Sequence, residues 1–351
     1  LLALLMRWNN SMVLLRLIFA FLIPLSCLMT DQVADVDLKT DIIIDTKQIV
    51  FEEYPDAFNP SILRVDEGFL LSFRFCPDIK NNPYYCRIGL ALLDENLETI
   101  IEPHLINTRL YTHQVQSQSE DAKLFRYQDR IFLIYHDNDK ETSPTIKQRR
   151  DMFIVEVFLH EGKYLAGPPL KLRAVHHYST QFWQKNWSAF TFDDQLLISY
   201  TINPHEILTL DFATGDCSYY CSSYCPINWN YGKLRGSSNP QLINGEYFGF
   251  FHSGRVVASN ASAGLNMWHY FFGAYTFSAE PPFALTKISP SPILAEGFYT
   301  DSEREKRVIF PGGFEISGDT VYLAYGKDDA EIWIATLNFS RLYASLISLE
   351  P

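Results

Sequence analysis

The sequence predicts an all-β protein, built as a single five-bladed β-propeller from about residue 40 to residue 351. Two observations lead to this prediction. Short apolar runs rich in aromatic and β-branched residues alternate with polar turns, and no long amphipathic helical pattern follows the N-terminal segment. A hairpin followed by a further strand also recurs five times, which is typical of propeller blades. A β-sandwich with long loops is the alternative fold.

Each predicted blade opens with two apolar runs on either side of a polar turn. We expect these hairpins at residues 60–74, 124–135, 187–200, 240–252 and 310–325. Further strands are expected at residues 87–93, 152–159, 206–212, 268–277 and 331–337. Asn244-Gly245 is the best short turn signal in the chain. Because a blade cannot bury both of its faces alone, stacking around an axis supplies the core.

Polar residues stand at matching places in the modules. Those just before a first strand are Asn59, Asp121, Asn186 and Asn239, and those at or beyond a second strand are His136, His205, His252 and Asp329. The innermost strand of a blade runs along the axis, so these positions are expected to converge on one central mouth. Each residue alone is more simply a satisfied turn residue, and it is the recurrence that favours a ligand site.

The second hairpin is preceded by two adjacent carboxylates and a cation, in the stretch Glu120-Asp121-Ala122-Lys123. Adjacent carboxylates beside a cation favour unequal pKa values, which is what an acid catalyst needs. The alternative interpretation is a solvated end of a loop.

Charge and composition exclude some classes of function. The formal net charge is -12 and no long basic run follows residue 40, so we expect no nucleic-acid partner. No glycine-rich phosphate loop or dinucleotide fingerprint occurs, which disfavours nucleotide chemistry. The 20 Tyr, 26 Phe and 6 Trp suit a sugar site and an ordinary β core equally well. No constellation of metal ligands stands out, so no metal is expected.

Residues 1–30 are predicted to be a targeting segment. Arg7 and Arg16 precede an apolar run at residues 17–29, which has the length of a signal peptide. It is a signal anchor instead if the run extends back to Met12. Either way we expect a protein of the secretory pathway, secreted or signal-anchored, that contacts a membrane only through such an anchor.

Export makes disulfides plausible. Cys76 and Cys86 bracket one loop and are expected to pair, as are two of the three residues Cys217, Cys221 and Cys225. A zinc site at the latter three lacks a fourth ligand at a suitable spacing. Sequons at Asn186, Asn260 and Asn338 agree with a secretory route.

Groups of short motifs in all five modules carry a family resemblance. They are Asn59-Pro60-Ser61 with Ser72-Phe73-Arg74 and Cys86-Arg87; Ser119-Glu120-Asp121-Ala122-Lys123; Lys185-Asn186-Trp187; Phe251-His252-Ser253; and Phe310-Pro311-Gly312-Gly313 with Tyr325-Gly326-Lys327-Asp328-Asp329. In this order and spacing they resemble glycoside hydrolase family 130, which carries Glu-Asp-Pro-Arg at the second of these places.

The resemblance implies a five-bladed propeller that acts on β-mannosides or related oligosaccharides, usually as an inverting phosphorylase without a cofactor. It makes Asp121 the general acid, while inorganic phosphate or a sugar phosphate serves as co-substrate. The implied substrate contacts are Asn59, Arg74, Arg87, Glu120, Asn186 and Asp329. The implied phosphate contacts are Lys185, His252 and one of Arg149 or Arg150, since a dianion needs several donors.

Two departures place the chain in a divergent branch. Lys123 stands where the family motif has Arg, and a Lys cannot replace an Arg in bidentate contacts. The fourth module reads Arg235-Gly-Ser-Ser-Asn-Pro240 instead of a run rich in Gly and Ala. Related branches include hydrolases and mannosyltransferases.

Three alternatives to a phosphorylase or transferase stay open. A β-mannoside hydrolase needs a second carboxylate about 6.5–9.5 Å from the acid, and Glu206 and Glu315 are the candidates. A non-catalytic propeller would keep the cleft and bind glycans. A protein-interaction propeller is favoured if Trp183 or Trp187 fills the central mouth. The acceptor sugar and the oligomeric state are not predicted.

Overall fold

The computed structural model describes residues 33–38, 40–110, 115–138, 150–176, 183–300 and 302–350. Within these residues the protein consists of β-strands with two short helices, η1 (Asn260–Ser262) and α2 (Phe339–Ala344), so the all-β prediction is confirmed. The predicted targeting segment lies outside the described residues. None of the helices in the described ranges is long and apolar enough to cross a membrane.

A four-stranded antiparallel sheet contains the first predicted hairpin. In spatial order its strands are β2 (Phe58–Val65), β3 (Gly68–Phe75), β4 (Arg87–Leu93) and β5 (Thr99–Leu105). The first three match the predicted hairpin and its further strand. The edge strand β5 buries only one of its seven residues, and so it lacks the strong apolar pattern of its neighbours.

A nine-stranded sheet contains the second and third predicted hairpins. One part comprises β6 (Glu120–Tyr127), β7 (Arg130–Asp137), β8 (Asp151–His160), β9 (Lys163–Ala166) and β10 (Leu170–Ala174). The other comprises β11 (Ser188–Phe192), β12 (Gln195–Thr201), β13 (His205–Leu210) and β14 (Asp216–Ser223). The two parts join through a short parallel pairing of β10 with β14.

A seven-stranded sheet contains the fourth predicted hairpin. Its strands are β15 (Arg235–Gly236), β16 (Gln241–Ile243), β17 (Glu246–Ala258), β18 (Asn266–Ser278), β19 (Leu285–Ile288), β20 (Lys306–Arg307) and β24 (Ile347–Ser348). The turn at Asn244-Gly245 lies between β16 and β17, as expected, and both of its residues have positive φ. β17 and β18 pair along their full length; β17 extends six residues beyond the predicted hairpin, whereas β18 nearly coincides with the predicted strand at residues 268–277.

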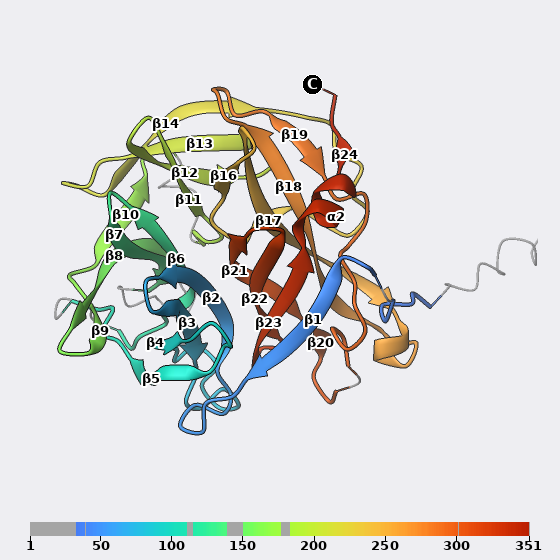
Figure 1. The fold of residues 1–351 in the computed structure, drawn as a ribbon, viewed down its shortest axis with the longest axis horizontal. Helices are drawn as coiled ribbons and strands as arrows, with labels where there is room; N and C mark the ends of the chain where they lie inside the picture. The colour runs from blue at the N-terminus through green and yellow to red at the C-terminus, as the bar shows by residue number, and fades with distance from the viewer. Residues whose placement is uncertain are drawn as a thin grey trace, which may run out of the picture.

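The last sheet joins the two ends of the described chain. Its strands are β1 (Ile43–Ile49), β23 (Glu331–Asn338), β22 (Thr320–Lys327) and β21 (Ile309–Ser317). Figure 1 shows the blue strand β1 beside the red strand β23, to which it is antiparallel. The chain therefore closes on itself through a strand that the hairpin pattern did not predict.

The sheets are arranged in a ring, as Figure 1 shows. β2 lies against both β21 and β6, which are far apart in the sequence. The apolar core is divided into clusters that lie between neighbouring strand groups. Pairs within these clusters are Leu70 and Leu133, Ile134 and Ile198, Phe190 and Phe277, Phe250 and Phe314, and Leu71 and Ile334. Stacking of sheets around a centre thus supplies the core.

The cysteines follow the prediction only in part. Cys76 and Cys86 form the predicted disulfide. Cys217, Cys221 and Cys225 are free thiols, so the predicted second pairing is wrong. Cys217 and Cys221 lie four residues apart on the extended strand β14, opposite Leu210 and Ile207. Four extended residues span about 13 Å, well beyond the Cα separation that a disulfide allows.

Candidate active site

A cavity of about 860 Å³ opens at the end of the ring where β6 begins. Arg74 from β3, Glu120 from β6 and His136 from β7 line it together with Arg150, Lys185 and Asp329. These residues come from four parts of the chain that the hairpin pattern predicted separately. The structure therefore brings five of the eleven predicted site residues to one mouth, while Asn59 and Asp121 connect to it through Arg74 without lining it.

Glu120 is the hub of an ionic cluster in this cavity. Its Oε1 lies 3.3 Å from Arg74 Nη2 and 3.3 Å from Arg150 Nη2, and its Oε2 lies 2.9 Å from His136 Nε2. Burial raises the pKa of Glu120, but Arg74, His136 and Arg150 outweigh it and hold that pKa well below its usual range. These neighbours therefore favour the ionised form of Glu120.

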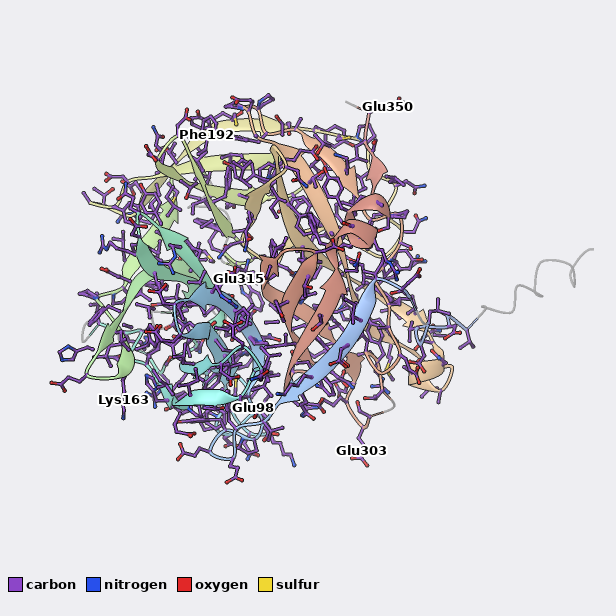
Figure 2. The ribbon with its side chains drawn as sticks, in the orientation of Figure 1. Glu98, Lys163, Phe192, Glu303, Glu315 and Glu350 are labelled. Atoms are coloured by element: carbon purple, nitrogen blue, oxygen red, sulfur yellow. A yellow bond between two sulfur atoms is a disulfide. The ribbon has the colours of Figure 1, made fainter. Side chains whose placement is uncertain are left out.

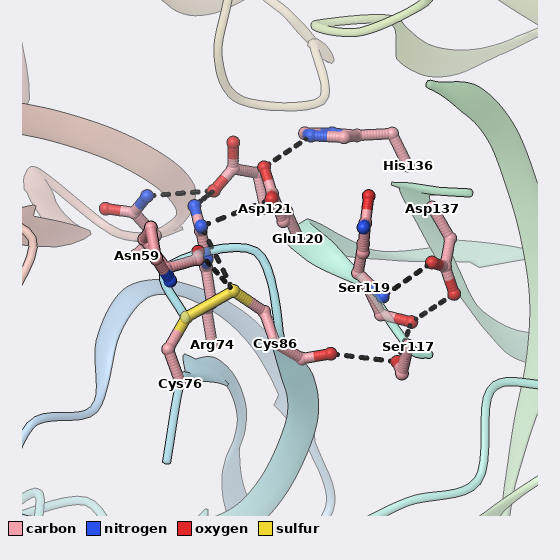
Figure 3. Close-up of a disulfide and its surroundings, with 12 residues drawn as sticks. Asn59, Arg74, Cys76, Cys86, Ser117, Ser119, Glu120, Asp121, His136 and Asp137 are labelled. Atoms are coloured by element: carbon pink, nitrogen blue, oxygen red, sulfur yellow. Dashed lines mark hydrogen bonds and ion pairs between the residues drawn. A yellow bond between two sulfur atoms is a disulfide. The ribbon is translucent and has the colours of Figure 1, made fainter. Parts of the chain in front are cut away.

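Asp121 faces the same guanidinium group although it is adjacent to Glu120 in the strand. Side chains of successive strand residues normally point to opposite faces. Here the pairing of β6 with β7 shifts register between Glu120 and Lys123, and Asp121 has a φ of 53°. A bulge of this kind redirects a side chain, so both carboxylates reach Arg74 (Figure 3).

The two oxygens of Asp121 have different surroundings. Oδ1 accepts a hydrogen bond of 2.8 Å from Asn59 Nδ2 and lies 3.5 Å from Arg74 Nη1. Oδ2 has no hydrogen-bond partner within the described ranges, and the side chain is 17% exposed. One oxygen thus holds the carboxyl group in place while the other is free to contact a ligand.

Asn59 and Arg74 form the wall behind Asp121. Asn59 has a φ of 46° and packs on Gly326, where any side chain would collide with it. Burial lowers the pKa of Arg74, but the negative charges of Glu120, Asp121 and Asp329 raise it by more. The pKa of Arg74 therefore lies above its ordinary value. Asn59 Oδ1 and Arg74 Nε are buried without a hydrogen-bond partner in the described part of the chain.

Glu120, Asp121 and His136 also have the donor atoms of a metal site. These atoms lie within 4.8 Å of one another. However, two guanidinium groups already compensate the charge of Glu120. The local charge thus favours an uncharged or anionic ligand over a cation, and the absence of a metal stays a prediction.

Lys123 does not line the cavity, although it belongs to the motif that contains Glu120 and Asp121. Its Nζ is buried and donates to the carbonyl oxygen of Trp187 at 2.7 Å and to Ser188 Oγ at 3.2 Å. Burial lowers the pKa of Lys123 to about 7, although Asp121 opposes the shift. The side chain therefore links β6 to the start of β11 beneath the site.

The predicted phosphate contacts are not equivalent. Lys185 lines the cavity with its Nζ 5.2 Å from the ring centre of Trp183, and it forms no ion pair among the residues described. Burial lowers the pKa of Lys185, while Asp121 and Glu120 oppose that shift. Arg150 also lines the cavity, but it is bound to Gln118 and Glu120. Arg149 lies outside the described residues.

His252 is close to these cations but is not a cavity-lining residue. It is buried, and its Nδ1 is 2.7 Å from Ser237 Oγ. Burial and the nearby charges of Arg235, Lys123 and Lys185 hold the pKa of His252 well below its usual range. A neutral, buried imidazole is a weaker phosphate contact than the motif implied.

The other predicted substrate contacts lie around the mouth. Asp329 lines the cavity and forms an ion pair with Lys306, a residue that no sequence pattern indicated. Arg87 begins β4 and does not line the cavity. Asn186 lines a smaller neighbouring cavity together with Lys185 and Trp183.

Two residues expected at this mouth lie elsewhere. His205 is fully buried, bound to Ser199 Oγ at 3.0 Å and to the carbonyl oxygen of Phe283 at 2.7 Å, and burial lowers its pKa to about 4. Asn239 accepts from the backbone of Ala189 and donates to that of Leu124. The hydrogen-bonding groups of both side chains are therefore used within the fold. This is the structural role that the sequence analysis gave as the simpler interpretation of each residue alone.

The candidate second carboxylates are also absent from this mouth. Glu315 lines a separate cavity of about 760 Å³, with Arg64 and Arg126, at the other ends of the inner strands. Figure 2 places it near the middle of the ring. Glu206 lies on β13, opposite Ser222, and does not line the cavity that holds Glu120.

We expect the neutral variant Glu315→Gln to be more stable than the wild type at high pH. Burial raises the pKa of Glu315 to about 7, although Arg64 and Arg126 oppose the shift. The folded state then binds more protons than the unfolded state between about pH 4.5 and 7, so its stability falls as the pH rises through that window. The gain at pH 8 is expected to be about 1–3 kcal/mol.

Urea unfolding at pH 4.5 and pH 8 measures this difference. Little gain is expected at pH 4.5, where the carboxyl group is largely neutral. Glu161→Gln is the control, because its side chain is 86% exposed on a turn. An equal gain at both pH values would show that ionisation of Glu315 is not the cause.

The mouth is not filled by tryptophan. Trp187 is buried in the core between sheets, with its ring 5.2 Å from that of Tyr200. Trp183 stands on the cavity wall and is 45% exposed. The observation that would have favoured a protein-interaction propeller is therefore not met.

Comparisons with known proteins agree on the fold. No family model and no curated protein matches the sequence. One solved structure matches with a TM-score of 0.62. It is described by the words "The GH130 family of mannoside phosphorylases contains glycoside hydrolases that target beta-1,2 mannosidic linkages in Candida mannan". It is 12% identical, and the match covers 90% of this chain and 99% of that one.

Two other solved structures represent different activities. A β-1,2-mannobiose phosphorylase from Listeria innocua matches with a TM-score of 0.54 and 15% identity, over 90% of this chain and 97% of that one. A GDP-Man-dependent mannosyltransferase from Leishmania mexicana matches with a TM-score of 0.55 and 11% identity, over 85% and 91%. The chain thus has the fold of glycoside hydrolase family 130 structures, and the low identities agree with a divergent sequence. At such identities the likeness concerns the fold alone.

Proposed function

We propose that this protein is a carbohydrate-active enzyme that breaks or makes a β-mannosidic bond, by inverting phosphorolysis or the reverse mannosyl transfer. The observation that carries the proposal is the geometry of Asp121, with one oxygen anchored by Asn59 and Arg74 and the other free. Because Arg74, Arg150 and His136 already engage both oxygens of Glu120, Asp121 is the carboxyl group with an oxygen left to face a glycosidic oxygen.

Asp121 is the general acid in this mechanism. It protonates the glycosidic oxygen, directly or through a sugar hydroxyl, as the bond from that oxygen to the anomeric carbon breaks. A phosphate oxygen attacks the same carbon from the opposite face, which inverts its configuration. Asn59, Arg74 and Asp329 hold the sugar, and ionised Glu120 accepts hydrogen bonds from its hydroxyl groups. No protein base is needed because phosphate is itself the nucleophile.

A phosphate-bearing co-substrate is supported by the excess of cations. Lys185 faces the cavity without an ion pair among the described residues, whereas Arg74 and Arg150 are shared with Glu120. An anion entering beside Lys185 would gain charge-assisted hydrogen bonds. A mannoside substrate is supported by the activities of the mannoside-acting proteins named above, which share the fold.

We also propose the finer organisation of the chain. The strand groups that begin with β2, β6, β11, β16 and β21 are the five blades of one propeller domain from about residue 40. Residues 1–30 direct the protein to the secretory pathway, which suits the Cys76–Cys86 disulfide.

A turnover assay with the purified protein tests the proposed function. β-1,2-mannobiose and other β-mannosides are supplied with and without phosphate, and mannose 1-phosphate or GDP-mannose is supplied with mannose as acceptor. Phosphate-dependent release of mannose 1-phosphate identifies a phosphorylase, and product formed only from a donor identifies a transferase. Free mannose released without phosphate identifies a hydrolase. Folded protein that is silent in every arm but binds sugars would be a glycan-binding propeller.

A further inference from the structure

The Cys76–Cys86 disulfide lies directly behind the candidate active site. Cys86 Sγ accepts a hydrogen bond of 3.2 Å from Arg74 Nη2, as Figure 3 shows. Both cysteines are buried, and the loop that they close, residues 77–85, carries Tyr84 into the wall of the cavity that holds Glu120. The disulfide thus touches the site, although the proposed chemistry gives it no role.

Few contacts fix the position of the Arg74 guanidinium group. It bridges two carboxylates, at 3.3 Å from Glu120 Oε1 and 3.5 Å from Asp121 Oδ1. Both distances exceed the roughly 2.7–2.9 Å of a strong charge-assisted hydrogen bond. On its other sides the guanidinium contacts the sulfur of Cys86 and the ring of Phe58, whose centre lies 4.8 Å from Arg74 Cζ. Sulfur and ring therefore help to decide where the guanidinium rests between the carboxylates.

Cys86 is itself held firmly. Its sulfur is bonded to Cys76, and its backbone N–H donates to the carbonyl oxygen of Ser117 at 3.1 Å. Its carbonyl oxygen accepts from Ser117 Oγ at 2.8 Å and from the backbone N–H of Ser119 at 3.2 Å. Ser119 directly precedes Glu120 in the chain. Cys86 therefore connects Arg74 with the segment that leads into the strand of both carboxylates.

We propose that Cys86 is a positioning residue of the active site, whose sulfur holds Arg74 at its place between Glu120 and Asp121. The inference rests on the proposed function and names a support of its general acid, because Arg74 helps to anchor Asp121. A disulfide sulfur is a weak, uncharged acceptor, so it orients the guanidinium without competing with the carboxylates for its charge. A displacement of about 1 Å in such a group can lower the rate about 100-fold.

Three variants that all lack the disulfide test the role of the sulfur. Cys76→Ala keeps a sulfur atom at residue 86, Cys76→Ala/Cys86→Ser replaces it with an oxygen, and Cys76→Ala/Cys86→Ala removes it. The loop is open in all three, so they differ in the atom that faces Arg74. Values of kcat and KM are measured with the β-mannoside or donor that the wild type converts in the turnover assay.

The double alanine variant is expected to have a kcat/KM at least about tenfold below that of Cys76→Ala, with most of the loss in kcat. The serine variant keeps an acceptor for Arg74 and is expected to recover most of that loss. Urea unfolding establishes that each variant is folded under the assay conditions. Cys221→Ala is the control, because it removes a free thiol that does not line the cavity, and it should turn over as the wild type does.

Ser117→Ala tests the same role with the disulfide intact, in case the open-loop variants do not fold. It removes one hydrogen bond from the Cys86 carbonyl oxygen and is expected to lower kcat/KM about twofold to fivefold. An unchanged kcat/KM in this variant would then overturn the inference.

Equal kcat/KM values in the three open-loop variants would overturn the positioning role and leave the proposed function intact. A loss in the double alanine variant that serine does not reduce would also overturn it, because packing would then be the cause. If the wild type converts none of the substrates, the proposed function fails and the positioning role fails with it.

Discussion

Asp121→Asn is expected to lower turnover of the preferred β-mannoside by about 10²–10⁴-fold, which is the usual contribution of a general acid. The amide keeps the oxygen that Asn59 and Arg74 contact, and Asn tolerates the left-handed backbone at this position. What it loses is the proton. Sugar binding measured by calorimetry should therefore stay within a few-fold of the wild type while kcat falls.

The matched control for this prediction is Asp129→Asn. Asp129 lies on the turn of the same hairpin and also has a positive φ, but it is remote from the cavity. It should leave both turnover and binding unchanged. Wild-type kcat in the Asp121→Asn variant would remove Asp121 from the role of acid, and the ionised Glu120 could not take over that role without a change in its surroundings.

The strand pattern could be predicted from sequence because it depends on local alternation and turn chemistry. The hairpins β2–β3, β6–β7 and β21–β22 fall where apolar runs flank polar turns. β5 and β14 each bury only one residue, so they carry little apolar signal. β1 could not be placed because its partner β23 is almost the whole length of the chain away.

The site was predictable where its residues belong to the inner hairpins. Asn59 and Asp121 meet because both stand at the start of the first strand of neighbouring groups, and Asp329 reaches the same mouth from the turn after β22. His205 and Asn239 occupy similar sequence positions, but local packing buries them and backbone groups satisfy them. Sequence spacing cannot distinguish these two outcomes, because it carries no information on burial.

Other site residues depend on contacts that no local pattern reveals. Tyr84 reaches the cavity because a disulfide folds its loop over Arg74, and Lys306 reaches it because β20 pairs with β18. The bulge that turns Asp121 toward Arg74 left one signal in the sequence. Two adjacent carboxylates in a regular strand point to opposite faces, so they cannot both line one site. If both belong to the site, an irregular strand is expected at this place.

Arg109→Met is expected to destabilise the fold by about 3–5 kcal/mol at neutral pH, because it leaves a buried carboxylate without its counter-charge. Asp137 is buried at the end of β7, the strand that pairs with β6, and both of its oxygens lie near Arg109 Nη1, at 3.1 and 3.2 Å. It also accepts from Ser119 Oγ at 2.7 Å and from the backbone N–H of Gln118 at 2.8 Å. This network fixes the residues that lead into Glu120.

The loss of stability should depend on pH with a definite sign. Burial raises the pKa of Asp137, and Arg109 only partly opposes the rise. Without Arg109 the pKa rises further, so the folded variant binds a proton more readily than the unfolded chain, and its stability falls as the pH increases. Urea unfolding should therefore show a smaller deficit at pH 5 than at pH 8.

Two further variants make this test specific. Adding Asp137→Asn to Arg109→Met removes the unpaired charge and should recover part of the lost stability. Arg173→Met is the matched control, because its partner Asp216 is 2.8 Å away but both side chains are 42% exposed, and such surface pairs contribute only about 0–1 kcal/mol. A deficit that is equal at both pH values, or a double variant no more stable than Arg109→Met alone, would mean that Arg109 acts through packing and not through the charge of Asp137.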